Sequence, residues 1–123
     1  MPGEVTITEQ THKMIKKVTF DWTTTTGGQA WGHSTVNNYD GEVLRIVCKI
    51  NSLATDGYSV IINDSDNFDL LGGQGTISTG EAHDFGTSTG IVNTPLSVVS
   101  GKLSLKILNA IQETTGQTIV YIR

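Results

Sequence analysis

The chain has 123 residues and a formal net charge of −4, and only 16% of its residues are charged. This length is enough for one domain with a single core and too short for two. The acidic balance argues against a nucleic-acid binder, which needs a surplus of Lys and Arg on one face, and no apolar run is long enough to span a membrane.

The N-terminal residues form a polar lead with one short alternating stretch, Val5–Thr8. This stretch could pair with the main sheet or with a neighbouring molecule. We expect an extended N-terminal arm over residues 1–13, followed by one β domain over residues 14–123. We further expect the arm to dock on a neighbouring subunit, with Val5 and Ile7 as its apolar anchors.

A basic cluster of three lysines and one histidine occupies residues 12–17 in a chain that is otherwise acidic. One interpretation is a solvated strand edge, where lysines discourage edge-to-edge pairing. The other is a contact with an acidic partner. The sequence leaves both open, and His12, Lys13 and Lys16 are therefore candidate partner-binding residues.

Alternation of apolar and polar residues predicts strands throughout the chain, and no stretch has a helical period. The six strands predicted to carry the core cover residues 15–23, 29–35, 42–51, 57–63, 102–107 and 118–123. We expect 57–63 to pair with 42–51, and the last two strands to form a hairpin through residues 112–116. Short strands separated by turn signals indicate an all-β protein, an antiparallel β-sandwich of jelly-roll type.

Two glycine-rich segments imitate catalytic or binding motifs. Residues 86–90 fit the pattern Gly-x-Ser-x-Gly around Ser88, but a nucleophile elbow requires a preceding strand and a following helix. Residues 72–75 have the composition of a phosphate loop, without the third glycine or the helix that would follow. We therefore expect no enzyme and no cofactor.

The single cysteine, Cys48, alternates inward with Leu44, Ile46 and Ile50. This position predicts a small buried apolar side chain, not a nucleophile. One cysteine cannot form an intramolecular disulfide, and no signal-peptide pattern opens the chain. Both features predict a protein made in a cytoplasm.

The acidic segment over residues 63–69 has two interpretations. Asp64, Asp66 and Asp69 could supply oxygen ligands to a calcium ion. A tight Asx turn after the strand ending at residue 63 explains the same residues without a metal. We predict the turn and no metal site, with calcium as the alternative.

Aromatic side chains offer a second kind of candidate site. Trp31 and Tyr39 lie in a polar, glycine-rich region together with His33 and could form a stacking platform for a sugar. Packing of Trp31 in the core or at a subunit interface is the other interpretation. Trp31 is therefore included among the candidate partner-binding residues.

Several segments, taken in order, carry a resemblance to a known group of proteins. They are VTFDWT (18–23), NYDG (38–41) leading to LRIV (44–47), DNFDLLGG (66–73), PL (95–96) and VYIR (120–123). This set resembles small proteins encoded among the virion-structure genes of tailed bacteriophages, over residues 17–123. The motifs carry no chemistry, so the resemblance implies a virion component without specifying which one.

A Thr- and Gly-rich, weakly charged β domain with an arm fits a capsid decoration or cement protein. We expect it to bind at junctions between major capsid protein subunits on the capsid surface and to stabilise the head of a virion assembled in the host cytoplasm. The expected partners are the major capsid protein and further copies of the chain, in a homo-oligomer such as a trimer. The alternatives are a tail, neck or fibre-associated virion subunit, or a carbohydrate-binding module that uses Trp31 and Tyr39, with calcium at Asp64 and Asp66.

Overall fold

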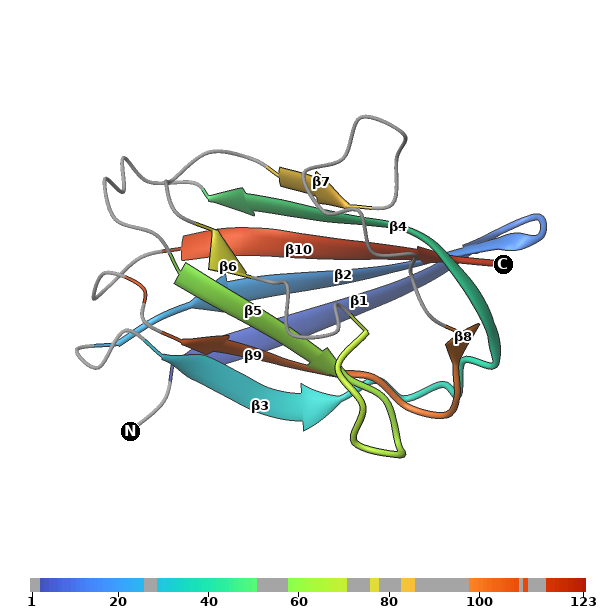
Figure 1. Cartoon of the computed structure of the whole chain (residues 1–123), viewed down its shortest axis with the longest axis horizontal. Coiled ribbons are helices and arrows are strands. Elements are labelled where there is room, and N and C mark those ends of the chain that lie inside the picture. The colour runs from blue at the N-terminus through green and yellow to red at the C-terminus, as the bar shows by residue number, and fades with distance from the viewer. Residues whose placement is uncertain are drawn as a thin grey trace.

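The computed structural model describes residues 3–25, 29–50, 58–70, 76–77, 83–85, 98–108, 110 and 115–123. These residues form ten strands in two antiparallel sheets, and none of them is helical (Figure 1). The all-β antiparallel prediction is confirmed. Within the described residues, no helix is long and apolar enough to cross a membrane.

The larger sheet contains six strands. Its order is β1 (Glu4–His12), β2 (Ile15–Thr23), β10 (Thr115–Ile122), β4 (Gly41–Ile50) and β7 (His83–Phe85), and β8 (Val98–Val99) pairs with the beginning of β4. The smaller sheet contains four strands. Its order is β3 (Ala30–Ser34), β9 (Ser104–Leu108), β5 (Tyr58–Asn63) and β6 (Thr76–Ile77).

The chain crosses repeatedly from one sheet to the other. β2, β4 and β10 lie in the larger sheet, whereas β3, β5 and β9 lie in the smaller one. The predicted pairing of 57–63 with 42–51 is therefore wrong, as is the hairpin between the last two strands. All four segments do form strands. Their partners were predicted wrongly because alternation identifies the side chains that face the core, and not the neighbouring strand.

The core lies between the two sheets. Val18, Phe20 and Trp22 of β2 are buried in one hydrophobic cluster with Tyr58 of β5. The rings of Trp22 and Tyr58 meet across the sheets with their centroids 5.3 Å apart. Gly116 of β10 lies opposite Trp22, and a Cβ at this position would overlap the indole. Glycine is therefore required here so that the largest side chain of the core can lie flat against the sheet.

The N-terminal segment is the edge strand of the larger sheet. β1 pairs with β2 along its whole length, from Glu4 opposite Thr23 to His12 opposite Ile15. Pairing with the main sheet is thus the alternative observed for Val5–Thr8. The prediction of a separate arm is therefore wrong for residues 4–12, which form a strand of the sheet. The predicted boundary at residue 13 falls in the turn between two paired strands.

A β-bulge in β4 corrects one further expectation. Tyr121 lies opposite Arg45, but Ile122 lies opposite Val43, so Leu44 is the extra residue. The bulge changes which side chains face inward. Val43, Ile46 and Cys48 belong to the core, whereas Leu44, expected to be buried beside them, is half-buried and outside the core cluster.

Candidate partner-binding site at the hairpin end

The β1–β2 hairpin marks one end of the sandwich, which we name the hairpin end. β1 runs toward this end, β3 and β5 finish there, and β4 begins there (Figure 1). The hairpin end is formed by the following residues: 12–15, 35–40, 64–70, 98–103 and 123. Its loops therefore come from positions far apart in the sequence.

Exposed apolar side chains gather at the hairpin end. In the described part of the chain, five large apolar side chains are exposed, and four of them lie here: Met14 (75% exposed), Ile15 (42%), Val36 (80%) and Phe68 (70%). Single exposed apolar residues are normal on a protein surface. Their concentration at one end makes the hairpin end the candidate surface for contact with another molecule.

The basic cluster spans the tip of the hairpin, residues 12–15, and the next two residues of β2, Lys16 and Lys17. His12 and Lys13 are exposed, and Lys16 is half-buried. The strand β10 reaches only to Ile122, which pairs with Lys16, so the turn beyond that pair has no third strand beside it. The structure thus brings together three of the predicted partner-binding residues, next to the exposed Met14.

The predicted Asx turn is confirmed in the loop after β5. The Oδ1 atom of Asp64 accepts hydrogen bonds from the backbone N–H groups of Asp66 (3.0 Å) and Phe68 (3.2 Å). The N–H of Asn67 donates to the carbonyl of Asp64 at 3.0 Å, and Asn67 has a φ of 68°, which Asn tolerates better than most residues. The turn holds the backbone of Phe68 in place while its ring stays exposed.

The same carboxylates bear on the calcium alternative. Asp69 accepts a hydrogen bond from the backbone N–H of Ile62 at 3.2 Å, so both Asp64 and Asp69 already bind main-chain donors. Across the described residues, no group of three or more His, Cys, Asp or Glu side chains is placed to hold a metal ion. The acidic segment acts as a turn that shapes the hairpin end.

Glu9 ties the edge strand to the loop after β3. Its carboxylate accepts hydrogen bonds from the backbone N–H groups of Val36 (2.9 Å) and Asn37 (3.0 Å) and from the hydroxyl of Tyr39 (2.8 Å). Burial alone would raise the pKa of Glu9, but the hydrogen bonds outweigh it and hold that pKa below its ordinary value. Burial and the neighbouring Glu9 carboxylate raise the pKa of Tyr39 to about 12.

A second set of bonds joins the remaining loops. The N–H of Tyr39 donates to the carbonyl of Gly101 at 2.7 Å, and the N–H of Gly101 donates to the carboxylate of Asp40 at 3.3 Å. The hydroxyl of Ser65 donates to the carbonyl of Ser100 at 2.6 Å. Three loops are thus held together, and the apolar side chains that they carry sit on a fixed backbone.

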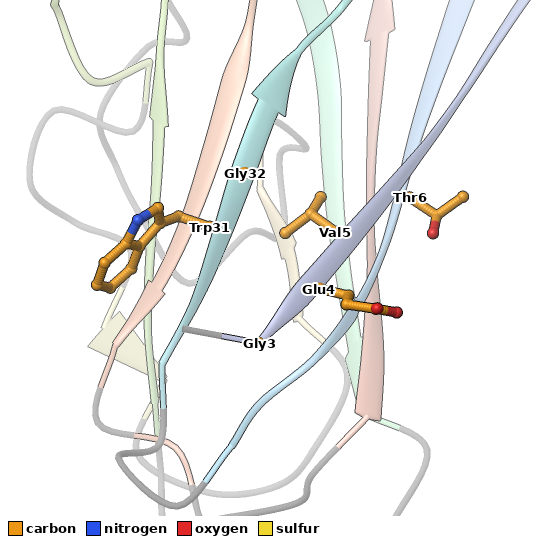
Figure 2. A pocket seen from close by; sticks show the side chains of 6 residues that line it. All are labelled: Gly3, Glu4, Val5, Thr6, Trp31 and Gly32. Atoms are coloured by element: carbon orange, nitrogen blue, oxygen red, sulfur yellow. The ribbon is translucent and has the colours of Figure 1, made fainter. Parts of the chain in front are cut away.

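Trp31 lies away from the hairpin end. It is 38% exposed on the outer face of the smaller sheet, and the Nζ atom of Lys106 lies 5.3 Å from the centre of its ring. A hollow of about 370 Å³ opens between β1 and β3 beside it, and its lining consists of Gly3, Glu4, Val5, Thr6, Trp31 and Gly32. The indole points away from this hollow (Figure 2). Tyr39 is buried in the core, so the alternative of a sugar platform formed by Trp31 and Tyr39 is wrong.

The two apolar anchors predicted for the arm are also corrected. Val5 is only 9% exposed and belongs to the core, and Ile7 is half-buried against it. Both side chains are used inside the sandwich because β1 is part of the sheet. Most of the exposed large apolar side chains in the described part of the chain, Met14 and Ile15 among them, lie instead at the hairpin end. A search for alternating patterns cannot separate such residues from core residues.

The buried cysteine behaves as expected. Cys48 is fully buried and accepts a long hydrogen bond from the hydroxyl of Thr118, 3.9 Å from its sulfur. Burial raises the pKa of the thiol to about 12, so it stays protonated at neutral pH.

The two glycine-rich segments that imitate catalytic or binding motifs, 72–75 and 86–90, both lie outside the described residues.

No protein-family model, curated protein or solved structure matches this chain. The role of the protein is therefore inferred from the hairpin end and from the sequence motifs.

Proposed function

We propose that this protein is a structural component of a tailed-phage virion, a capsid decoration or cement protein that binds where major capsid protein subunits meet. The observation that supports the proposal is the hairpin end, where four exposed apolar side chains gather and two of them, Val36 and Phe68, sit on loops fixed by hydrogen bonds. A fixed loop loses little conformational entropy on binding, so more of the contact energy appears as affinity. Many copies on one particle would add avidity.

The buried and bonded polar groups favour binding over catalysis. Among the described residues, the Glu9 and Asp64 carboxylates accept two main-chain hydrogen bonds each, and Cys48 is a neutral thiol in the core. These groups support the architecture and leave the exposed surface to make contacts. An inert scaffold of this kind suits a particle component better than an enzyme.

A jelly-roll arrangement is part of the proposal. The order β2-β10-β4-β7 in one sheet, facing β3-β9-β5-β6 in the other, is the order that two interleaved Greek keys would give. β1 then extends the larger sheet at its free edge. Jelly rolls serve many functions, so the fold supports a capsid role only together with the hairpin end and the sequence resemblance.

The proposal is tested on purified particles from infected cells. Quantitative mass spectrometry measures the copies of the protein per particle, and electron cryo-microscopy locates them. We expect a fixed number of copies on the head surface, with the hairpin end against the major capsid protein. Density on the tail, neck or fibres would move the protein to the alternative virion role, and its absence from particles would remove the virion proposal.

A further inference from the structure

The tip of the hairpin projects beyond the body of the sandwich. β1 and β2 continue to pair up to His12 and Ile15, one residue beyond the last pair between β2 and β10. In Figure 1 the turn extends past the labelled C-terminus. Met14, three-quarters exposed, lies at its apex. The tip is therefore free to enter a recess in another molecule.

The residues of the turn are poor choices for the turn itself. In two-residue hairpin loops, a loop position with a positive φ favours Gly, Asn or Asp. Lys13 occupies such a position, with a φ of 58°. A side chain in this region costs roughly 1 kcal/mol relative to glycine. Backbone strain that folding does not require is characteristic of functional positions. We therefore infer that Lys13 and the exposed Met14 contribute to a function other than folding.

Charge distinguishes the tip from the rest of the molecule. The three lysines of residues 12–17 contribute +3 to a chain of formal net charge −4, so the remaining residues carry −7. No carboxylate residue occurs between Glu9 and Asp21, and the Glu9 carboxylate is turned toward the loop after β3. The tip is a local positive charge around an apolar apex.

We propose that the tip, residues 12–15, inserts into an apolar depression rimmed by carboxylates on the partner protein, with Lys16 at the base of the tip facing the rim. Met14 would fill the depression, because its flexible thioether adapts to irregular cavities. Lys13 and Lys16 would pair with the rim, where complementary charge sets the orientation and speeds the encounter. This inference rests on the proposed function, since it gives the chemistry of the partner surface at the same hairpin end.

The charge distribution favours a protein over an extended anionic surface. A membrane or a nucleic acid would present negative charge to the body of the molecule as well as to the tip, and the body carries −7. At ordinary ionic strength, salt screens electrostatic interactions beyond about 10 Å. A ring of carboxylates that contacts the tip would therefore attract the lysines of residues 12–17 and repel the acidic body only weakly. The exposed Met14 and Ile15 also match a protein recess better than a phosphate backbone.

The test uses particles assembled without this protein, to which purified full-length variants are added. We expect Lys13→Glu and Met14→Ser each to weaken binding by roughly tenfold or more. Lys49→Glu is the matched control, because Lys49 is an exposed lysine of β4 that pairs with Gln117 away from the hairpin end. It should change binding less than about twofold.

Lys13→Gly separates binding from folding. Glycine adopts the positive φ without strain, so this variant should unfold at the same or a higher temperature than the parent. It should nevertheless bind particles several-fold more weakly, because it removes a tip cation. Raising NaCl from about 50 to 500 mM should weaken the parent more than Lys13→Glu.

Each other result has a definite meaning. If the parent binds particles and the tip variants bind equally well, the tip inference is overturned while the proposed function stands. If the parent does not bind particles at all, the proposed function fails, and the inference fails with it. If the parent self-associates and Lys13→Glu abolishes this, the tip binds a second copy of the chain. If the parent binds vesicles of anionic lipid and Met14→Ser abolishes this, the tip binds a membrane. Both would overturn the protein-recess proposal.

Discussion

Two turns at the hairpin end present exposed apolar side chains in different ways. In the loop after β5, Asn67 takes the positive φ and the Asp64 side chain binds the backbone on both sides of it. In the β1–β2 turn, Lys13 takes the positive φ, and no side-chain hydrogen bond within the described residues supports it. The first turn is explained by folding. The second has no such support, and the contact that we propose with a partner protein would account for its residues.

The largest effect is expected from Asp64→Ala. This change leaves the backbone N–H groups of Asp66 and Phe68 without their acceptor and should lower the free energy of unfolding by about 2 kcal/mol. Asp66→Ala is the matched control, because the exposed Asp66 side chain has no such role, and it should change stability by less than about 0.5 kcal/mol. Urea denaturation measures both. Equal losses for the two variants would show that the side-chain bonds do not hold this turn.

Glu9→Gln should have the next largest effect, a loss of about 1 kcal/mol at neutral pH. The amide keeps the size of the side chain but lacks the charge that strengthens the bonds to Val36, Asn37 and Tyr39. Because folding lowers the pKa of Glu9 below 4.5, its contribution is present above pH 4.5 and is lost as the pH falls through the lower pKa of the folded state. Unfolding measured from roughly pH 7 to pH 3 should bring the parent and the variant closer together. A constant difference would contradict this pKa direction.

Lys13→Gly should stabilise the protein by roughly 0.5 to 1 kcal/mol, because it removes the strain of a side chain at positive φ. Asn67→Gly, the corresponding change in the other turn, should alter stability by less, since Asn already tolerates this conformation. Thermal unfolding of the two variants gives the comparison directly. A destabilised Lys13→Gly would mean that the lysine contributes to the fold, and its positive φ would no longer point to a role in binding.

The smallest effects on stability are expected at the exposed apolar side chains. Met14→Ser and Phe68→Ser remove groups that contact mostly solvent, so each should change the free energy of unfolding by less than about 0.5 kcal/mol. Both should weaken binding to particles. A loss of more than about 1 kcal/mol in either variant would place that side chain inside the fold.

Much of the fold could be predicted from local pattern. The alternation in residues 15–23 and 118–123 corresponds to β2 and β10, whose inward side chains Val18, Phe20 and Val120 are completely buried. The strand partners could not be predicted, since successive strands cross between sheets and pairing depends on contacts remote in sequence. The bulge at Leu44 could not be predicted either, because it depends on the register between β4 and β10 at Ile122.

The site could be predicted only where it is continuous in sequence. The lysines of residues 12–17 stand out by composition, and the structure places them together. Val36 and Phe68 could not be predicted, because an apolar residue in a short loop looks the same in sequence when buried or exposed. The clamp formed by Glu9 spans 27 residues to Val36, and no local pattern indicates it.

We propose that the hairpin end is the surface by which this protein binds a particle. A density map of the purified virion tests it most directly, because the map gives both location and orientation. We predict density for this chain on the head, with the side chain of Met14 buried against the major capsid protein. A map in which the chain is present but its hairpin end faces solvent would show that another surface makes the contact.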